Sequence, residues 1–286
     1  MTETPNLPIV RTVAALRAHT RLWRERGETI ALVPTMGALH EGHLSLVRMA
    51  RVQADRVVAS IFVNPKQFGP KEDFAAYPRD ERTDADLLAG ERCDLMYAPD
   101  PAEIYPPGFS TTVSIGALAQ VMDGAARPGH FDGVATVVTK LLTQCAPNVA
   151  IFGEKDYQQL LVIRRLIKDL DLQIEALGAP IVRAPDGLAL SSRNAYLSPA
   201  ERQIAATLPM VLNEAARSLT GGRTVAETES LARAALSASG FQKVDYVEVR
   251  GADDLSRLGP GPLTGPGRLF AAAWLGKTRL IDNLAV

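Results

Sequence analysis

The chain has 286 residues, of which 47% are hydrophobic and 22% charged, and its formal net charge is −1. These proportions are those of an ordinary folded protein and exclude disordered and collagen-like chains. A net charge near zero gives no long-range attraction to a nucleic-acid backbone or an anionic membrane, so we expect neither as a partner. The length allows one large domain and a smaller one.

The start of the chain and its cysteines indicate where the protein works. Residues 1–5 lack the basic and apolar parts of a signal peptide, and no apolar run is long enough to span a bilayer. Cys93 and Cys145 stand far apart and outside any CxxC motif, which favours reduced thiols over a disulfide framework or a zinc site. We therefore expect a cytoplasmic protein.

Strand and helix signals alternate along the first part of the chain. Residues 29–34 predict a buried strand, followed by a glycine-containing loop and a helix. Residues 56–63 are almost all apolar or β-branched, which is typical of a parallel strand covered on both faces. A helix, a buried strand and an amphipathic helix follow over residues 135–144, 149–152 and 157–170. This order predicts an α/β fold, with a Rossmann-like parallel sheet and helices on both faces.

The last third of the chain has a different pattern. Helices are predicted over residues 199–219 and 225–239, and strands over 244–249 and 269–274. The Gly/Pro-rich segment 259–267 is predicted to be a loop between these strands. We therefore expect a Rossmann-like domain over residues 1–181 and a smaller C-terminal α+β domain over residues 182–286.

Residues 34–43, PTMGALHEGH, lie between the first strand and its helix and form the first candidate site. Gly37 and Gly42 allow positive φ or close backbone approach, and the helix start offers N–H groups to an anion. His40 and His43 could donate hydrogen bonds to phosphate oxygens and follow charge onto departing pyrophosphate. The pattern favours an adenylyl-transfer site over ordinary surface histidines, and also over a metal site, which HxxH supports less well than HExxH.

Uncharged amides follow the second strand. Asn64 and Gln67 suit a hydroxylated organic acid, although Pro65 could simply end the strand in a turn. The next stretch is acidic, and we interpret it as a solvated helix in preference to a Mg²⁺ neighbourhood. Its acidic residues are Asp73, Asp80, Asp84 and Asp86.

Three further segments carry candidate site residues. In the turn of residues 153–156, Lys155 could bind phosphates, while Asp156 could accept from a ribose or cap the next helix. Gln159 lies one helical turn further on. The loop-like segments 127–133 and 190–194 place arginine, which suits phosphate and carboxylate, beside small polar residues.

Together these motifs resemble the pantothenate synthetase (pantoate–β-alanine ligase) family of the HxGH nucleotidyltransferase superfamily. The resemblance covers almost the whole chain, through PTMGALHEGH, FVNPKQF, YPRD, RPGHFDGV, FGEKDYQQL and LALSSRN in that order. It implies an ATP-dependent ligase that condenses (R)-pantoate with β-alanine through pantoyl adenylate, giving pantothenate, AMP and pyrophosphate. It also implies Mg²⁺ with the ATP, and a homodimer.

The resemblance also assigns residues. His43 matches the family's proton-donor histidine, with His40 and Lys155 as further catalytic residues. Organic substrates are expected at Gln67 and Gln159, with Asn64, Arg127 and His130 nearby. ATP is expected at Met36, Gly37, Ala38, Leu39, His40, Glu41, Gly42, His43, Gly153, Glu154, Lys155, Asp156, Val182, Leu190, Ser191, Ser192 and Arg193.

Two details of the resemblance concern the segment 190–193. Leu190 stands where methionine is common, which keeps an apolar contact. The Ser-Ser-Arg sequence resembles the mobile KMSKS loop of class I aminoacyl-tRNA synthetases, so we expect it to close over ATP. Two other readings remain open: a different nucleotidyltransferase of the superfamily, and a nucleotide-binding regulator without turnover.

Overall fold

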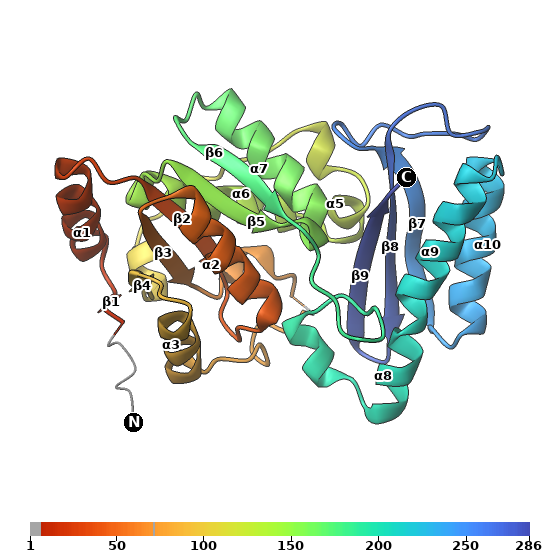
Figure 1. Cartoon of the computed structure of the whole chain (residues 1–286), viewed down its shortest axis with the longest axis horizontal. Coiled ribbons are helices and arrows are strands. Elements are labelled where there is room, and N and C mark those ends of the chain that lie inside the picture. The colour runs from red at the N-terminus through yellow and green to blue at the C-terminus, as the bar shows by residue number, and fades with distance from the viewer. Residues whose placement is uncertain (1–6, 71) are drawn as a thin grey trace. The chain divides into compact units, whose positions relative to one another are not determined.

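The computed structural model describes residues 7–70 and 72–286, and the chain divides into two compact units (Figure 1). Unit 1 runs to Glu154 and continues over Gln159–Pro180. Unit 2 comprises Lys155–Gln158 and Ile181–Val286. Within the described ranges, no helix is both long and apolar enough to cross a membrane.

Unit 1 contains a parallel sheet of six strands in the order β1-β4-β3-β2-β5-β6. The strands are β1 (Ile9–Val10), β2 (Ile30–Thr35), β3 (Arg56–Ile61), β4 (Leu95–Tyr97), β5 (Val149–Gly153) and β6 (Glu175–Ala179). The order reverses at β2, which pairs with β3 on one side and with β5 on the other. Ligands of such sheets bind beyond the carboxyl ends of the strands at this reversal, where the segments after β2 and β5 begin.

Helices cover both faces of this sheet, as the sequence predicts. Ala31 and Val33 of β2 belong to one buried cluster with Val47 and Leu88. Since successive strand side chains point to opposite faces, Leu32 faces the other side, and it is buried too. The helices are α1 (Val13–Glu25), α2 (Glu41–Gln53), α3 (Glu81–Gly90), α4 (Pro101–Ile104), α5 (Asp123–Ala126), α6 (His130–Cys145) and α7 (Tyr157–Asp169). Short 3₁₀ turns are η1 (Pro65–Gln67), η2 (Ala117–Ala119) and η3 (Glu154–Asp156).

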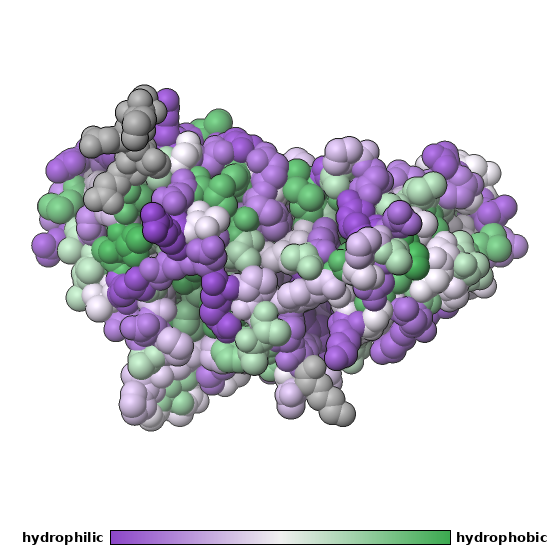
Figure 2. All heavy atoms as spheres, turned by 90° about the horizontal axis from the view of Figure 1, so that it is seen from below, coloured by the Kyte–Doolittle hydropathy of each residue, from purple (hydrophilic) through white to green (hydrophobic). Residues whose placement is uncertain are grey.

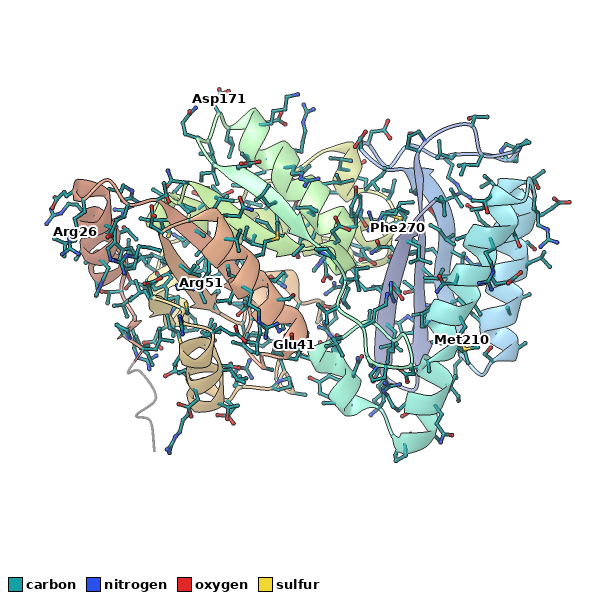
Figure 3. The ribbon with its side chains drawn as sticks, in the orientation of Figure 1. Arg26, Glu41, Arg51, Asp171, Met210 and Phe270 are labelled. Atoms are coloured by element: carbon teal, nitrogen blue, oxygen red, sulfur yellow. The ribbon has the colours of Figure 1, made fainter. Side chains whose placement is uncertain are left out.

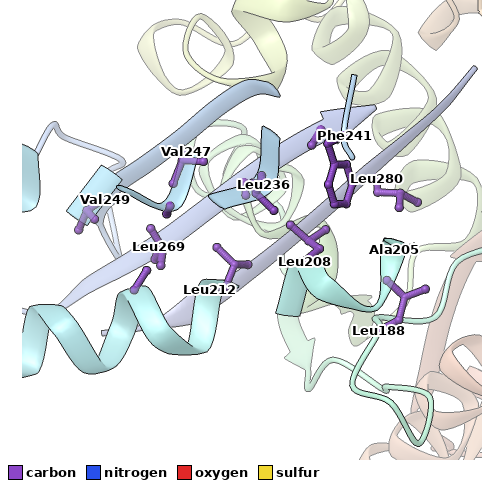
Figure 4. Close-up of a cluster of buried hydrophobic side chains, with 14 of the residues drawn as sticks. Leu188, Ala205, Leu208, Leu212, Leu236, Phe241, Val247, Val249, Leu269 and Leu280 are labelled. Carbon is purple, nitrogen blue, oxygen red and sulfur yellow. The ribbon is translucent and has the colours of Figure 1, made fainter. Parts of the chain in front are cut away.

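Unit 2 has an antiparallel sheet in the order β7-β8-β9. Its elements are η4 (Ser192–Tyr196), α8 (Pro199–Ala205), α9 (Thr207–Thr220), α10 (Val225–Ala238), β7 (Lys243–Gly251), β8 (Gly267–Leu275) and β9 (Thr278–Ala285). Leucines of α9 and α10 pack on valines and leucines of the strands to form its core (Figure 4). The predicted α/β fold with a smaller α+β part is thus confirmed.

Two sequence predictions for unit 2 are wrong in detail. The single helix predicted over residues 199–219 is two helices, because Pro209 has no N–H to donate to Ala205 and the chain breaks at Ala206. Strand β9 escaped prediction because Asp282 and Asn283 interrupt its apolar alternation.

The large apolar side chains that are exposed lie singly along the chain. On the face shown in Figure 2, polar side chains surround scattered apolar ones. The most exposed of the large apolar residues are Val52, Met210 and Leu231. Scattered exposure of this kind is normal for a folded protein.

Candidate active site

The loop between β2 and α2 has a backbone that only certain residues tolerate. Gly37 and Ala38 both have positive φ, at 80° and 50°. A Cβ on Gly37 would lie 2.8 Å from Asp84 Oδ2 and 3.1 Å from Ile61 Cγ2. The Gly37 N–H also donates to Thr35 Oγ1 at 3.2 Å. Gly37 is therefore required here both for its φ and for the close approach of its neighbours.

Asp84 of α3 holds this loop. Its carboxylate accepts from the Ala38 N–H at 3.0 Å and from the Leu39 N–H at 2.7 Å. It is only 2% exposed, so the prediction that the acidic stretch is simply solvated is wrong at this position. Burial raises the pKa of Asp84, against the opposing effect of the two N–H groups. The available sequence signal was its helical spacing from Leu88, which places an acid on the buried face of α3.

His40 and His43 form a reciprocal cap at the start of α2. The Gly42 N–H donates to His40 Nδ1 at 3.1 Å, and the His40 N–H donates to His43 Nδ1 at 3.3 Å. The two ring centroids are 4.1 Å apart. The helix start was expected to offer its N–H groups to a ligand. That expectation is wrong for Gly42 and His43, because the His43 N–H donates to the His40 carbonyl at 2.7 Å.

This cap determines which tautomer each imidazole adopts. A ring nitrogen that accepts a hydrogen bond carries no proton, so Nδ1 is the acceptor in both rings and Nε2 carries the proton. A second proton on either ring would have to displace a backbone N–H from Nδ1. The cap therefore favours two neutral imidazoles, each with an Nε2–H donor.

Glu41 follows His40 in the first turn of α2 (Figure 3). Its carboxylate pairs with the Arg48 guanidinium, which also binds Glu91. The hydrogen bond from Arg48 lowers the pKa of Glu41. The Glu41 side chain is thus held by Arg48. Any contact of Glu41 with a ligand would come from its backbone.

Asn64 and Gln67, which follow β3, have different surroundings. Asn64 is 1% exposed, and its Nδ2 donates to Gln67 Oε1 at 3.0 Å and to the Gly133 carbonyl at 3.1 Å. Its Oδ1 accepts from Tyr105 Oη at 2.8 Å. Gln67 is partly exposed, and its Nε2 lies 3.2 Å from Met36 Sδ. Asn64 therefore orients Gln67, and Gln67 joins two of the sequence motifs.

Arg127 and His130 surround the backbone of Gln67. His130 Nδ1 lies 2.9 Å from the Gln67 carbonyl, and Arg127 donates to His130 Nε2 at 3.0 Å. Since a guanidinium can only donate, Nε2 is the acceptor and Nδ1–H donates to the carbonyl. Arg127 also forms a two-pronged pair with Glu72, at 2.7 and 2.6 Å. Segment 127–133 is not wholly a loop, because α6 begins at His130.

His130 stays neutral in this arrangement. Burial, and then the charge of Arg127, lowers the pKa of His130 from its ordinary value of 6.5 to about 4. A neutral imidazole can accept from Arg127 while it donates to Gln67, whereas an imidazolium could not accept. The network therefore depends on the His130 imidazole remaining neutral, with its one proton on Nδ1.

The other predicted site residues lie around the start of α7 and in the segment after β6. Lys155 is half-buried, with its Nζ 3.8 Å from Asp156 Oδ2, and Gln159 is also half-buried in the first turn of α7. The Leu190 N–H donates to the Val182 carbonyl at 2.9 Å and closes a hairpin. Ser191 Oγ accepts from the Arg193 N–H at 3.3 Å, so the predicted loop is a capped 3₁₀ turn.

Over residues 7–70 and 72–286, no group of three His, Cys, Asp or Glu side chains could hold an ion. Asp84, the buried carboxylate nearest the loop after β2, uses both oxygens on backbone N–H groups.

Comparison with known sequences gives a consistent result over the full chain. The family model described as pantoate-beta-alanine ligase matches residues 8–285. Proteins named pantothenate synthetase from Caulobacter vibrioides and Rhodospirillum rubrum are 60% and 57% identical to this chain. These alignments cover 97% and 98% of this chain, and 98% and 99% of the two relatives.

Solved structures show the same likeness. A pantothenate synthetase from Thermus thermophilus aligns with a TM-score of 0.92 at 46% identity, over 97% of this chain and 99% of that chain. A pantoate-beta-alanine ligase from Francisella tularensis, described as complexed with beta-gamma ATP and beta-alanine, aligns with a TM-score of 0.83 at 33% identity. That alignment covers 97% of both chains.

Proposed function

Because the chain belongs to the pantoate–β-alanine ligase family, we propose how its own residues carry out the ligation. The reaction condenses pantoate with β-alanine at the expense of ATP, through pantoyl adenylate, and releases AMP and pyrophosphate. The observation that carries the proposal is the reciprocal His40–His43 cap, which fixes two Nε2–H donors at the start of α2.

In the first step, the pantoate carboxylate attacks the α-phosphate of ATP in line, and pyrophosphate leaves. The Nε2–H groups of His40 and His43 donate to the phosphate oxygens on which charge accumulates, and Lys155 adds a positive charge. Donors that are already oriented need no rearrangement as the charge develops, which is why they lower the barrier. The cap supports this role because it holds both rings before the substrate arrives.

Pantoate is positioned by the amides of Gln67 and Gln159 in our proposal. Asn64 orients the Gln67 side chain, while Arg127 and His130 hold its backbone carbonyl. We therefore assign Asn64, Arg127 and His130 to support the substrate amide, and Gln67 to contact both pantoate and β-alanine. A fixed amide aligns the carboxylate for attack, and alignment is a large part of catalysis in such reactions.

In the second step, the free-base amine of β-alanine attacks the acyl carbon of pantoyl adenylate and expels AMP. The reaction requires no enzyme nucleophile. The two cysteines are consistent with this, because burial raises the pKa of Cys93 to about 11 and that of Cys145 to about 12. Both thiols are thus protonated and inert at neutral pH.

ATP contacts come from both parts of the chain in the proposal. Residues 36–43 and 153–156 bind the phosphates and ribose, and Val182 with Leu190–Arg193 covers the nucleotide. Residues 1–181 would then bind ATP and pantoate, and residues 182–286 would form the lid domain. We also propose that Mg²⁺ arrives bound to ATP, that the chain forms a homodimer, and that it works in the cytoplasm.

The proposal is tested by separating the two half-reactions. We expect pantoate-dependent exchange of labelled pyrophosphate into ATP, followed by AMP release when β-alanine is added. Absence of exchange with folded protein would contradict the ligase assignment and favour a regulator without turnover. Exchange without β-alanine-dependent AMP release would contradict the second step alone, and transfer of the nucleotide to a phosphorylated acceptor would favour another nucleotidyltransferase.

A further inference from the structure

Strand β9 carries two adjacent polar residues where a core strand would ordinarily be apolar. Asp282 and Asn283 are each only 2% exposed, between apolar residues of the same strand. Burying a carboxylate or an amide is costly unless every polar atom finds a partner. Their partners, all within unit 2, include Lys155, which is proposed to bind ATP, and Arg183, which follows the proposed ATP contact Val182.

Asn283 holds the main chain of Lys155. Its Nδ2 donates to the Lys155 carbonyl at 3.0 Å, across 128 positions of sequence. Its Oδ1 accepts from Arg268 Nε, and the Arg268 guanidinium lies 3.8 Å from the Tyr157 ring centroid. The Tyr157 ring in turn lies 6.0 Å from the ring of Phe270 on β8. The short segment Lys155–Gln158 is therefore fixed to the antiparallel sheet at two points.

Asp282 holds the hairpin that leads to the Ser-Ser-Arg turn. Its Oδ2 and Oδ1 accept from Arg183 Nη1 and Nη2 at 2.6 and 2.8 Å. Arg183 Nη1 also donates to the Gly187 carbonyl at the tip of the hairpin, at 3.0 Å. Val182 and Leu190, the hydrogen-bonded ends of this hairpin, are both proposed ATP contacts.

We propose that Asp282 and Asn283 are positioning residues, which set Lys155 and the hairpin of residues 182–190 in the geometry that ATP requires. This inference rests on the function proposed above. A buried ion pair adds little net stability compared with apolar packing, but removing either partner leaves an uncompensated charge, which keeps Asp282 and Arg183 together. Two neighbouring residues of one strand therefore bind both segments.

The informative variant is Asn283→Asp. A carboxylate retains the size of the side chain and pairs with Arg268, so the fold is retained, but it cannot donate to the Lys155 carbonyl. We expect kcat/KM for ATP in pyrophosphate exchange to fall by about ten- to a hundredfold. This is the loss of rate that a displacement of a catalytic group by about 1 Å can cause. KM for β-alanine in the second step should stay within about twofold. The thermal midpoint should fall modestly, because the Lys155 carbonyl loses its donor. Asn283→Ala provides a second variant if the aspartate destabilises the protein.

Asp245→Asn is the matched control. Asp245 lies on β7 of the same sheet, its side chain is 7% exposed, and it accepts from Trp274 Nε1 at 3.0 Å and Arg279 Nε at 2.8 Å. It therefore resembles Asp282 in burial and charge but contacts none of the proposed ATP residues. An equal loss of exchange in this control would show a general effect of sheet stability and would overturn the inference.

A double-variant cycle tests whether Asn283 acts through Lys155. If it does, Asn283→Asp should have almost no further effect on exchange in a Lys155→Ala background. Full additivity of the two losses, or exchange within twofold of wild type in Asn283→Asp, would overturn the inference. Absence of exchange in the wild-type chain would instead contradict the proposed function, so the two failures are distinguishable.

Discussion

At the scale of single residues, several side chains of the candidate site bind backbone atoms of neighbouring segments. The Nδ1 atoms of His40 and His43 cap α2, and in the proposed function their Nε2–H groups donate to phosphate. Asp84 and His130 hold the main chain of the loop 36–39 and of Gln67. Substitutions at these residues should therefore affect thermal stability and the rate of catalysis to different extents.

His43→Ala should slow adenylate formation by about 10², the usual cost of one charge-stabilising donor. Single-turnover pyrophosphate release measures this step. His43→Gln is the control for the cap, because glutamine at this helix position accepts from the N-cap N–H. We expect both variants to be slow and only His43→Ala to lose thermal stability. Normal adenylation in either variant would contradict the role of the imidazole.

Asp84→Asn should lower pyrophosphate exchange by about tenfold or more. The amide NH₂ would face the Ala38 or Leu39 N–H and leave it unpaired, at a cost of about 1–3 kcal/mol. Asp80→Asn is the control on the same helix, because asparagine replaces aspartate well as an N-cap. Equal exchange rates for the two variants would show that Asp84 does not organise the loop.

His130 should make stability fall on mild acidification. Its folded pKa of about 4 is below the ordinary 6.5, so below pH 6.5 the unfolded chain takes up a proton that the folded chain does not. The stabilisation is complete above pH 6.5 and is lost between pH 6.5 and 4, by on the order of 3 kcal/mol. Urea unfolding across this range measures it. His130→Gln should flatten the profile, and an unchanged slope would contradict the prediction.

At the scale of elements, the site is built where a turn or loop meets a helix at short range. Helix α6 passes so close to the turn η1 that a Cβ on Gly133 would lie 2.2 Å from the Lys66 carbonyl oxygen and 2.6 Å from the Gln67 nitrogen. The position of Gln67 is therefore set by the absence of a side chain on a different element.

Gly133→Ala should displace η1, since backbone atoms must move to admit the methyl group. We expect KM for pantoate to rise by about tenfold and the thermal midpoint to fall. Gly90→Ala is the matched control, because Gly90 ends α3 and an added Cβ there meets nothing within 4 Å. That variant should leave KM unchanged and keep or slightly raise stability. A pantoate KM that is unchanged in Gly133→Ala would contradict the assignment of Gln67.

At the scale of the whole molecule, no group of three His, Cys, Asp or Glu side chains over residues 7–70 and 72–286 could hold a metal ion. Because we propose that Mg²⁺ arrives bound to ATP, we expect chelation by EDTA to abolish pyrophosphate exchange and added Mg²⁺ to restore it. The thermal midpoint without ATP should not change, because the ion would enter with the nucleotide. A midpoint that falls on chelation would reveal a structural metal and contradict this prediction.

The sequence by itself determined the fold class and the local positions of most site segments. Periodicity and β-branched runs identify the parallel sheet, and PTMGALHEGH must lie between β2 and α2 because strand, glycines and helix are adjacent in the chain. Such features depend on neighbours within a few positions. The resemblance through six motifs then indicated the family before any contact was known.

Only the tertiary structure decided which side chains hold those segments. Asp84 binds Ala38 across 46 positions and Asn283 binds Lys155 across 128, and neither distance leaves a periodic signal in the sequence. The same holds for the histidine cap, because the tautomers depend on hydrogen-bond directions that no residue pattern encodes. Local sequence fixes where the reactive groups lie along the chain, whereas long-range hydrogen bonds to buried polar atoms fix how they are oriented.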